Sequence, residues 1–127
     1  MQGTLIDTDI WVDFFHDQRY ARELITKVST QGLIFISILT ITELRTGFTQ
    51  EQSNFFFPIL YKFAEITPIS KTVAELAGRF RWEFRRKGII LSTVDSIIAA
   101  TVILNDYQLV TRNKKDFPMS EIKFYEF

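Results

Sequence analysis

The stretch TLIDTDIWVDFF, residues 4–15, decides the fold because it changes from a strand pattern to a helix pattern within a few residues. The apolar pair Leu5 and Ile6 is typical of a short buried strand, and residues 9–17 repeat apolar side chains at helical spacing. Asp7 lies between the two patterns, although a carboxylate is costly to bury. The stretch therefore predicts a buried strand that places a carboxylate at the point where the strand ends.

Length and composition indicate one globular domain over residues 1–127. The chain is 46% hydrophobic and 15% aromatic, which is enough to build a core and excludes a disordered chain. It contains no cysteine, which excludes disulfides, thiolate nucleophiles and sulfur-ligated metals and fits a reducing compartment. Fifteen basic residues balance fifteen acidic ones, so the binding of a nucleic acid would need a local basic patch.

The N-terminal sequence carries no targeting pattern. The residues MQGTLIDTD, 1–9, lack the basic and the long apolar segments of a signal peptide, and no apolar run in the chain is long enough to span a bilayer. We therefore expect a cytoplasmic protein with no membrane partner.

Strand and helix patterns alternate along the chain. The predicted strands are residues 4–7, 33–37, 65–69, 108–111 and 122–127. The predicted helices are residues 9–17, 19–30, one that starts at Thr40 with Gly47 as a possible end, one from a Ser70 cap to Gly88, and residues 92–104. This alternation predicts an α/β fold, a three-layer α/β/α sandwich with a mostly parallel central sheet.

Acidic residues follow several of the predicted strands or lie in the first turns of the next helices. They are Asp7, Glu43, Asp95 and Asp116, with Asn113 close to the last of them. Ligands of parallel sheets bind beyond the carboxyl ends of the strands, so we expect these side chains to meet at one edge. Carboxylates that converge repel each other unless a cation is present, and an all-oxygen set favours Mg²⁺ or Mn²⁺.

Most of these acids also have a purely structural interpretation. Thr40 and Glu43 have the spacing of a capping box, which is the favoured interpretation of that pair taken alone. Asp95 complements the dipole of its helix, and Asp116 suits a turn cap. Asp7 caps nothing obvious in the sequence, so it is the acid that most needs a functional explanation.

Three further features bear on surfaces. Asp9 and Asp13 are expected on the solvent side of the first helix, with Asp9 close enough to Asp7 to influence it. The segment 79–87, RFRWEFRRK, is interpreted as a solvated helix face, with contact to phosphates or an acidic partner as the alternative. The segment 55–63, FFFPILYKF, belongs either to the core or to a protein interface.

The order of motifs resembles that of a known family. The motifs are LIDTDIWVDFF, SILTITELRTG, AGRFRWEFRRKGIILSTVDSIIAATVIL and LVTRNKKDF. From about Thr4 to Phe117 they resemble the PIN-domain ribonucleases, most closely the VapC toxins of prokaryotic toxin–antitoxin pairs. The resemblance implies a PIN-like sandwich, acids that hold Mg²⁺ or Mn²⁺, hydrolysis of RNA phosphodiesters and inhibition by a cognate antitoxin.

The resemblance assigns roles to individual residues. Asp7 and Asp95 are expected to bind the metal, and Glu43 to bind it or orient the attacking water. At the fourth position many relatives have an acid where this chain has Asn113, while Asp116 matches the acid of the N-x-x-D-F pattern. Either residue is therefore expected to complete the site, and the products are expected to carry 5′-phosphate and 3′-hydroxyl ends.

Residues that border the acids are expected to support them or to contact substrate phosphates. These are Thr8, Asp9, Thr111, Arg112 and Asn113, with Lys114 and Lys115 as the nearest basic patch. The number of aromatic residues, Trp11, Phe14, Phe15, Phe55 and Phe56 among them, predicts a homodimer and an antitoxin contact in addition to a core.

Two other functions are compatible with parts of the sequence. IDTD after a strand is also found in aspartyl-phosphate phosphatases, in which Asp7 would be the nucleophile and Asp9 the acid/base. That alternative leaves Glu43 without a role. A non-catalytic PIN-like binding module is the second alternative, and the intact acids disfavour it. The sequence does not select among transfer, ribosomal and messenger RNA as the substrate.

Overall fold

A central sheet of five parallel strands organises the molecule. The computed structural model describes residues 3–127, so the first two residues of the predicted domain 1–127 lie outside the described residues. The strands are β1 (Thr4–Ile6), β2 (Ile34–Ser37), β3 (Ala64–Thr67), β4 (Gln108–Val110) and β5 (Lys123–Phe124). They are ordered β3-β2-β1-β4-β5, and every neighbouring pair is parallel. The predicted parallel sheet is confirmed.

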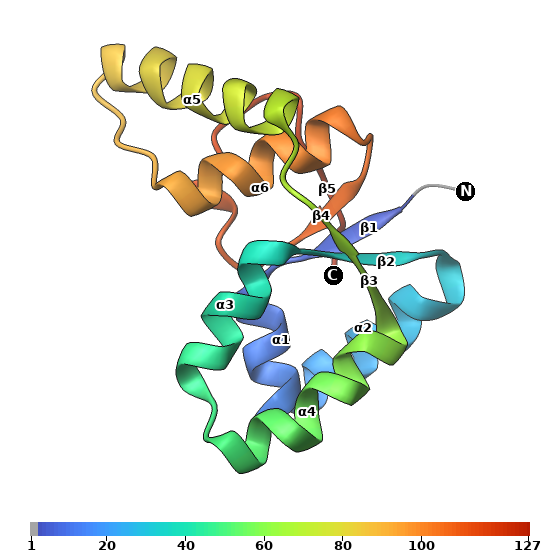
Figure 1. Cartoon of the computed structure of the whole chain (residues 1–127). Coiled ribbons are helices and arrows are strands. Elements are labelled where there is room, and N and C mark those ends of the chain that lie inside the picture. The colour runs from blue at the N-terminus through green and yellow to red at the C-terminus, as the bar shows by residue number, and fades with distance from the viewer. Residues whose placement is uncertain (1–2) are drawn as a thin grey trace.

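Helices cover both faces of this sheet. They are α1 (Thr8–Phe15), α2 (Arg19–Gln31), α3 (Ile38–Gly47), α4 (Gln50–Phe63), α5 (Lys71–Arg86) and α6 (Thr93–Leu104), followed by the 3₁₀ turn η1 (Lys114–Asp116). Helices α5 and α6 lie on one face, and α1 to α4 lie on the other (Figure 1). The predicted three-layer sandwich is therefore the observed architecture.

Strands β1 and β4 each contribute to both hydrophobic cores because side chains alternate along a strand. Leu5 and Leu109 point into the core formed with α5 and α6. Ile6 and Val110 point into the core on the side of α1 to α4. Strand β1 is thus buried on both faces, which explains its fully apolar end before Asp7.

The chain order of the strands reverses at β1. Strands β2 and β3 follow on one side of β1, whereas β4 and β5 lie on its other side. In open parallel sheets, ligands bind in the crevice at the carboxyl ends of the two strands where the order reverses. Here that position lies after Ile6 and Val110, so the fold places Asp7 and Thr111 at the crevice.

The helix signals at both ends of α5 are confirmed. The hydroxyl of Ser70 accepts the backbone N–H of Val73, which caps the helix at its start. Gly88 follows the last turn with a φ of 82°, a left-handed conformation that costs glycine no steric clash. Segment 79–87 therefore lies on the C-terminal half of a well-terminated helix.

One helix start was predicted wrongly, and one helix was not predicted. Helix α3 begins at Ile38 with Ser37 as its cap, and not at Thr40, which is fully buried in the first turn. Segment 55–63 is the second half of helix α4, whose capping box is formed by Thr49 and Gln52. The third and fifth predicted strands also shift: β3 is Ala64–Thr67, and β5 is limited to Lys123–Phe124.

The aromatic residues divide between core and surface. Trp11 is fully buried, and its ring contacts those of Phe14 and Phe15 at centroid distances of 5.6 and 6.2 Å. Phe56 stacks on Phe15 at 4.7 Å, whereas Phe55 is 66% exposed. The core therefore absorbs more of these residues than the sequence suggested. Among residues 3–127, no helix has the length and apolar character needed to cross a membrane.

Candidate active site

Asp7 is fixed by three hydrogen bonds at the junction of β1, α1 and β4. Its backbone N–H donates to the carbonyl of Val110 at 3.0 Å. Its Oδ1 accepts the backbone N–H of Thr8 at 2.9 Å, and its Oδ2 accepts the hydroxyl of Thr111 at 3.0 Å. Asp7 is also the N-cap of α1, so the statement that it caps nothing was wrong.

Burial changes the titration of this carboxylate. Loss of hydration raises the pKa of Asp7 from 3.8 to about 7, and the negative charges of Asp9 and Asp95 act in the same direction. The hydrogen bonds from Thr8 and Thr111 oppose the rise in pKa without cancelling it. An ionised Asp7 is therefore unfavourable here unless a positive charge approaches it.

Glu43 extends from α3 toward the start of α1. Its Oε1 accepts the hydroxyl of Thr8 at 2.6 Å, and the Thr8 hydroxyl lies 3.0 Å from that of Thr40. The capping-box interpretation of Thr40 and Glu43 is wrong, because the Ser37 hydroxyl caps this helix by accepting the N–H of Leu39 at 3.2 Å. The carboxylate of Glu43 is thus free for a role at the edge of the sheet.

Asp95 lies in the first turn of α6, where Ser92 is the cap. The Ser92 hydroxyl accepts the backbone N–H of Asp95 at 3.0 Å. Burial raises the pKa of Asp95, a hydrogen bond with Ser92 lowers it, and the charges of Asp116 and Glu43 raise it further. These mutual charge effects show that the acids from α3, α6 and η1 share one electrostatic environment with Asp7.

Asp9 is not on the solvent side of α1 as expected. Its side chain is 14% exposed. Its Oδ2 accepts the backbone N–H of Arg112 at 2.9 Å and the side-chain amide of Asn113 at 3.1 Å. Its Oδ1 accepts the N–H of Ile10 at 2.8 Å. Asp9 therefore joins α1 to the segment between β4 and η1, and the Asn113 amide serves this junction.

Arg112 is engaged within the protein. Its Nε lies 3.2 Å from Asp13 Oδ2 and 3.8 Å from Asp9 Oδ2. The hydroxyl of Tyr20 donates to the same Asp13 oxygen, which places Asp13 in this network. Thr111 is buried and donates to Asp7, so it supports an acid and does not face open space.

Asp116 is the least constrained of the four acids. It is exposed at the end of η1. Within residues 3–127, no N–H or O–H donates to its carboxylate, so the turn-cap interpretation has no hydrogen bond to support it. Of the nearby basic patch, Lys114 pairs with Glu126 at 3.0 Å, which leaves Lys115 without an acidic partner.

The acids fit a divalent cation but do not yet form a closed cage. In the part of the chain that the structure describes, no three acidic or histidine side chains already converge on one point. The side chain of Glu43 is turned to Thr8, as expected of carboxylates that repel each other. Oxygen donors alone, together with the raised pKa values of Asp7 and Asp95, suit a hard divalent cation that Asp7, Asp95, Glu43 and Asp116 would hold.

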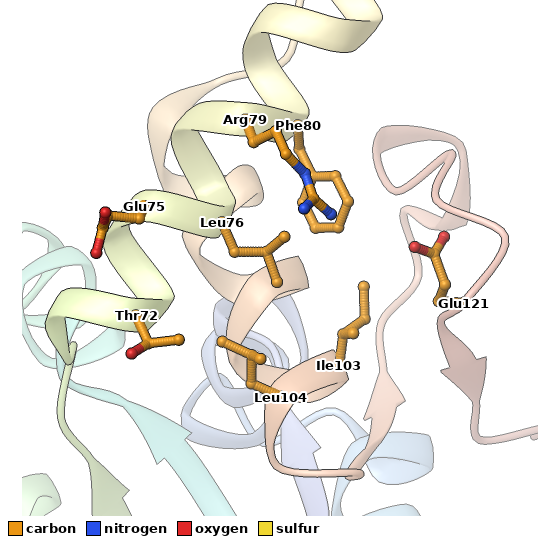
Figure 2. Close-up of a pocket in the computed structure, with 8 residues that line it drawn as sticks. All are labelled: Thr72, Glu75, Leu76, Arg79, Phe80, Ile103, Leu104 and Glu121. Carbon is orange, nitrogen blue, oxygen red and sulfur yellow. The ribbon is translucent and has the colours of Figure 1, made fainter.

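A cavity of about 500 Å³ lies away from these acids, between α5, the end of α6 and the C-terminal segment. Figure 2 shows Leu76, Ile103 and Leu104 at its base, with Glu75 and Glu121 on opposite sides. The other lining residues are Thr72, Arg79 and Phe80. None of the candidate acids lines this cavity, so it is separate from the site at the sheet edge.

The sequence of the chain is similar to those of known proteins. A family model described as the PIN domain matches residues 4–124. The chain belongs to the PIN-domain family. This PIN domain is 31% identical to ribonuclease VapC19 of Mycobacterium tuberculosis strain H37Rv, over 91% of the chain and 92% of that protein. It is also 31% identical to ribonuclease VapC2 of Rickettsia felis, over 89% of the chain and 88% of that protein.

Solved structures show the same fold. VapBC2 from Rickettsia felis, bound to a promoter DNA fragment, superposes on this PIN domain with a TM-score of 0.87 over 99% of both chains at 23% identity. A toxin–antitoxin complex from Klebsiella pneumoniae superposes with a TM-score of 0.76 at 28% identity, over 98% of this chain and 99% of that one. The resemblance predicted from the motifs is confirmed.

Some supporting residues of this PIN domain were missed in the sequence. Ser92 was included in the predicted helix 92–104, although its spacing to Asp95 is that of a helix cap. The contact between Thr8 and Glu43 joins two helices that are far apart in the sequence, so no local sequence pattern indicates it. The same is true of Tyr20, whose contact with Asp13 links α2 to the Arg112 network.

Proposed function

We propose that this PIN domain is an endoribonuclease that hydrolyses RNA phosphodiesters with Mg²⁺ or Mn²⁺ and acts as the toxin of a toxin–antitoxin pair. The observation that carries the proposal is that the acids after β1 and in α3, α6 and η1 interact through their charges near the point where the strand order reverses. Relatives that match most of the chain are named ribonucleases, which supports RNA as the substrate.

The acidic residues have different roles in hydrolysis. A bound divalent cation lowers the pKa of water and neutralises charge that builds on the phosphate. Asp7 and Asp95 hold the cation: burial raises the pKa of both, as it does that of Asp9, but Asp9 already accepts hydrogen bonds that join α1 to the segment after β4. Glu43 holds it or orients the attacking water.

The remaining polar residues keep these acids in position. Thr8 keeps the Glu43 carboxylate at the site, and Asp9 holds the segment that carries Asp116. Asp116 completes the acidic set, whereas Asn113 contributes through Asp9. Water attacks the phosphorus and the 3′-oxygen leaves, which produces 5′-phosphate and 3′-hydroxyl ends.

The geometry disfavours the phosphatase alternative. That mechanism needs Asp9 as a mobile acid/base beside a nucleophilic Asp7. Both oxygens of Asp9 already accept hydrogen bonds from the backbone, one from Ile10 and one from Arg112. The binding-module alternative has no observation in its favour, since the four acids are present.

Metal dependence tests the proposed activity. Purified protein should cleave total cellular RNA with Mg²⁺ or Mn²⁺, and EDTA should abolish the cleavage. Glu51→Gln, which removes an exposed acid on α4, should leave activity unchanged and serves as the control for loss of charge. Equal cleavage in excess EDTA would overturn the metal mechanism, and a metal-binding protein without any cleavage would favour the binding module.

We also propose protein partners and a location. Solved relatives of this fold are complexes of toxin and antitoxin, which supports a cognate antitoxin that places a basic side chain among the acids. The exposed ring of Phe55 on α4 supports a homodimer. Light scattering at micromolar concentration should show two chains, and a monomer would contradict the dimer. We place the protein in the cytoplasm.

A further inference from the structure

A group of basic side chains occupies the C-terminal half of α5 and the residue after it. They are Arg81, Arg85, Arg86 and Lys87, here called the basic tract, and all four are exposed. Within residues 3–127, none of the four forms an ion pair with an acidic side chain. By contrast, Arg79 one turn earlier pairs with Glu83 at 3.3 Å. The tract therefore carries positive charge that the protein itself does not neutralise.

A small cavity lies beside two members of the tract. Its volume is about 170 Å³, and its lining residues are Gly78, Arg81, Arg85, Ile90 and Leu91. A side chain at Gly78 would meet no atom within 4 Å, so the space beside both arginines is open. At about 30 Å³ per water molecule in the liquid, the cavity has room for a hydrated phosphate group.

The cavity lies four residues along the chain from the acidic site. Nε of Arg81 donates to the carbonyl of Leu91 at 3.2 Å. The next residue, Ser92, caps α6 and accepts the N–H of Asp95. Because consecutive Cα atoms are about 3.8 Å apart, Leu91 and Asp95 are separated by at most about 15 Å. An RNA strand with one phosphate at Asp95 therefore reaches the cavity within a few nucleotides.

An exposed aromatic residue accompanies the charges. Trp82 is 53% exposed, and the guanidinium of Arg86 lies 4.7 Å from the centroid of its ring. An exposed indole ring is not expected on a helix face that only contacts water. Indole and guanidinium planes together are the usual surface on which proteins stack unpaired nucleobases.

The acidic site itself makes such a surface necessary. The carboxylates of Asp7, Asp9, Glu43, Asp95 and Asp116 repel a polyanion, and one divalent cation neutralises only part of that charge. Of the cations close to Asp116 within residues 3–127, Arg112 is paired with Asp13 and Lys114 with Glu126, and Lys115 alone has no acidic partner. The basic tract is the neighbouring surface that offers arginines without acidic partners.

We propose that the basic tract and Trp82 bind a single-stranded segment of RNA next to the bond that is cut. Arg81 and Arg85 contact phosphates at the cavity, and Trp82 stacks on an unpaired base. This inference rests on the proposed ribonuclease function, because it takes RNA as the substrate of the acidic site. It deepens that function by specifying an unpaired strand as the form of RNA that is bound.

Binding in EDTA tests the proposal separately from cleavage. The probe is a short fluorescein-labelled RNA without self-complementarity, used alone and as a duplex, and the readout is fluorescence anisotropy at several salt concentrations. Arg81→Gln/Arg85→Gln should weaken binding of the single strand about tenfold, and the slope of log affinity against log salt should fall by about 1.4, which is the loss of two phosphate contacts. Lys27→Gln/Lys71→Gln, which removes the same charge on α2 and at the start of α5, should leave both quantities unchanged.

The aromatic contact is tested by a second pair of variants. Trp82→Ala should weaken binding of the single strand about tenfold and leave the duplex unaffected, whereas Trp82→Phe should restore most of the loss. Thermal unfolding of every variant shows whether α5 remains folded. Equal losses for the single strand and the duplex would overturn the stacking role.

Two other outcomes separate the competing explanations. If the Arg81/Arg85 and Lys27/Lys71 pairs of substitutions have the same effect, the tract is a solvated face and the proposal fails. If the Arg81/Arg85 variant changes the number of chains measured by light scattering while RNA binding is unchanged, the surface is an interface between copies and the proposal also fails. A wild-type protein that binds the RNA through the tract but cleaves nothing with Mn²⁺ would overturn the proposed catalysis and leave the binding surface in place.

Discussion

Asp7 and Asp116 are the same chemical group at two ends of one site, yet their surroundings differ completely. Asp7 is largely buried and accepts hydrogen bonds at both oxygens, from Thr8 and Thr111. Asp116 is exposed and receives no hydrogen bond within residues 3–127. The comparison shows a site with a fixed half, built where β1 meets α1, and an adjustable half on η1. In the proposed metal site, we expect the fixed half to determine where a cation binds and the adjustable half to determine how tightly it binds.

Substitution in the fixed half should have the largest effect. Asp7→Asn keeps the size of the side chain and its ability to cap α1, but it removes the charge. We expect RNA cleavage at saturating Mn²⁺ to fall by about 10² or more, as when a preorganised electrostatic group is lost. Stability without metal should stay equal or rise, because a buried charge is gone. A variant as active as wild type would remove Asp7 from the site.

Substitution in the adjustable half should change metal affinity more than the maximal rate. For Asp116→Asn we expect the Mn²⁺ concentration that gives half-maximal cleavage to rise about tenfold, the usual range for loss of one supporting ligand contact. Thermal stability in EDTA should be flat or slightly higher, since one member of a repelling set is gone. Lower stability with an unchanged metal requirement would show that Asp116 is a turn cap and would leave Asp7, Glu43 and Asp95 as the whole acidic site.

The junction between Asp7 and Glu43 should show an intermediate effect. Thr8→Val removes the hydroxyl that donates to Glu43 and that lies beside the buried Thr40. The rate of cleavage should fall about fivefold, the worth of one hydrogen bond to a charged group that is partly exposed. Thr8→Ser should restore the rate because it returns the hydroxyl. Loss of activity in both variants would indicate a packing role for the Thr8 methyl group.

Folding stability, as distinct from activity, should depend on pH. Burial raises the pKa of Asp7 from 3.8 to about 7, so the folded state binds a proton that the unfolded state has already released. The stability from this group is complete below pH 3.8 and is lost as pH rises toward 7, at a slope of up to about 1.4 kcal/mol per pH unit. Urea unfolding in EDTA should show this decline. Asp7→Asn should flatten it, and a curve of unchanged slope in the variant would assign the titration to other groups.

The sequence predicted the elements that have their own local signals. The Ser70 cap and Gly88 stop of α5 are both local, and the structure has them at those residues. Asp7 was found because a charge directly after an apolar strand is unusual. The order of the acids along the chain was enough for the family assignment, which the match to residues 4–124 confirms.

The errors occurred where distant segments decide the structure. Taken alone, the spacing of Thr40 and Glu43 favoured a capping box, because the sequence does not show that β2 ends at Ser37 and that Ser37 caps the next helix. Asp9 and Asp13 have the spacing of a solvent-facing pair, but the segment after β4 contacts both of them and Tyr20 of α2 contacts Asp13. A local sequence pattern cannot indicate a contact between residues that are so far apart in the chain.

Helix α4 was missed for a different reason. Its capping box at Thr49 and Gln52 is visible in the sequence, but Pro58 disfavours a helix and the run of phenylalanines has no clear apolar stripe. Packing supplies the missing stability, since Phe63 contacts Phe14 at 5.7 Å and Phe56 stacks on α1. Propensity was overridden by contacts that depend on the fold of the N-terminal half.

The position of β1 in the sheet has a consequence for synthesis of the chain. Strand β1 is made first, but its partner β4 is among the last segments to leave the ribosome. The bond from Thr111 to Asp7 spans 104 residues, and the Val110 carbonyl that binds the Asp7 N–H arrives with it. Such distant contacts form late because closing a long loop is entropically costly. A chain still in translation therefore lacks the supports of its first acid, and the site assembles only when nearly the whole domain has been released.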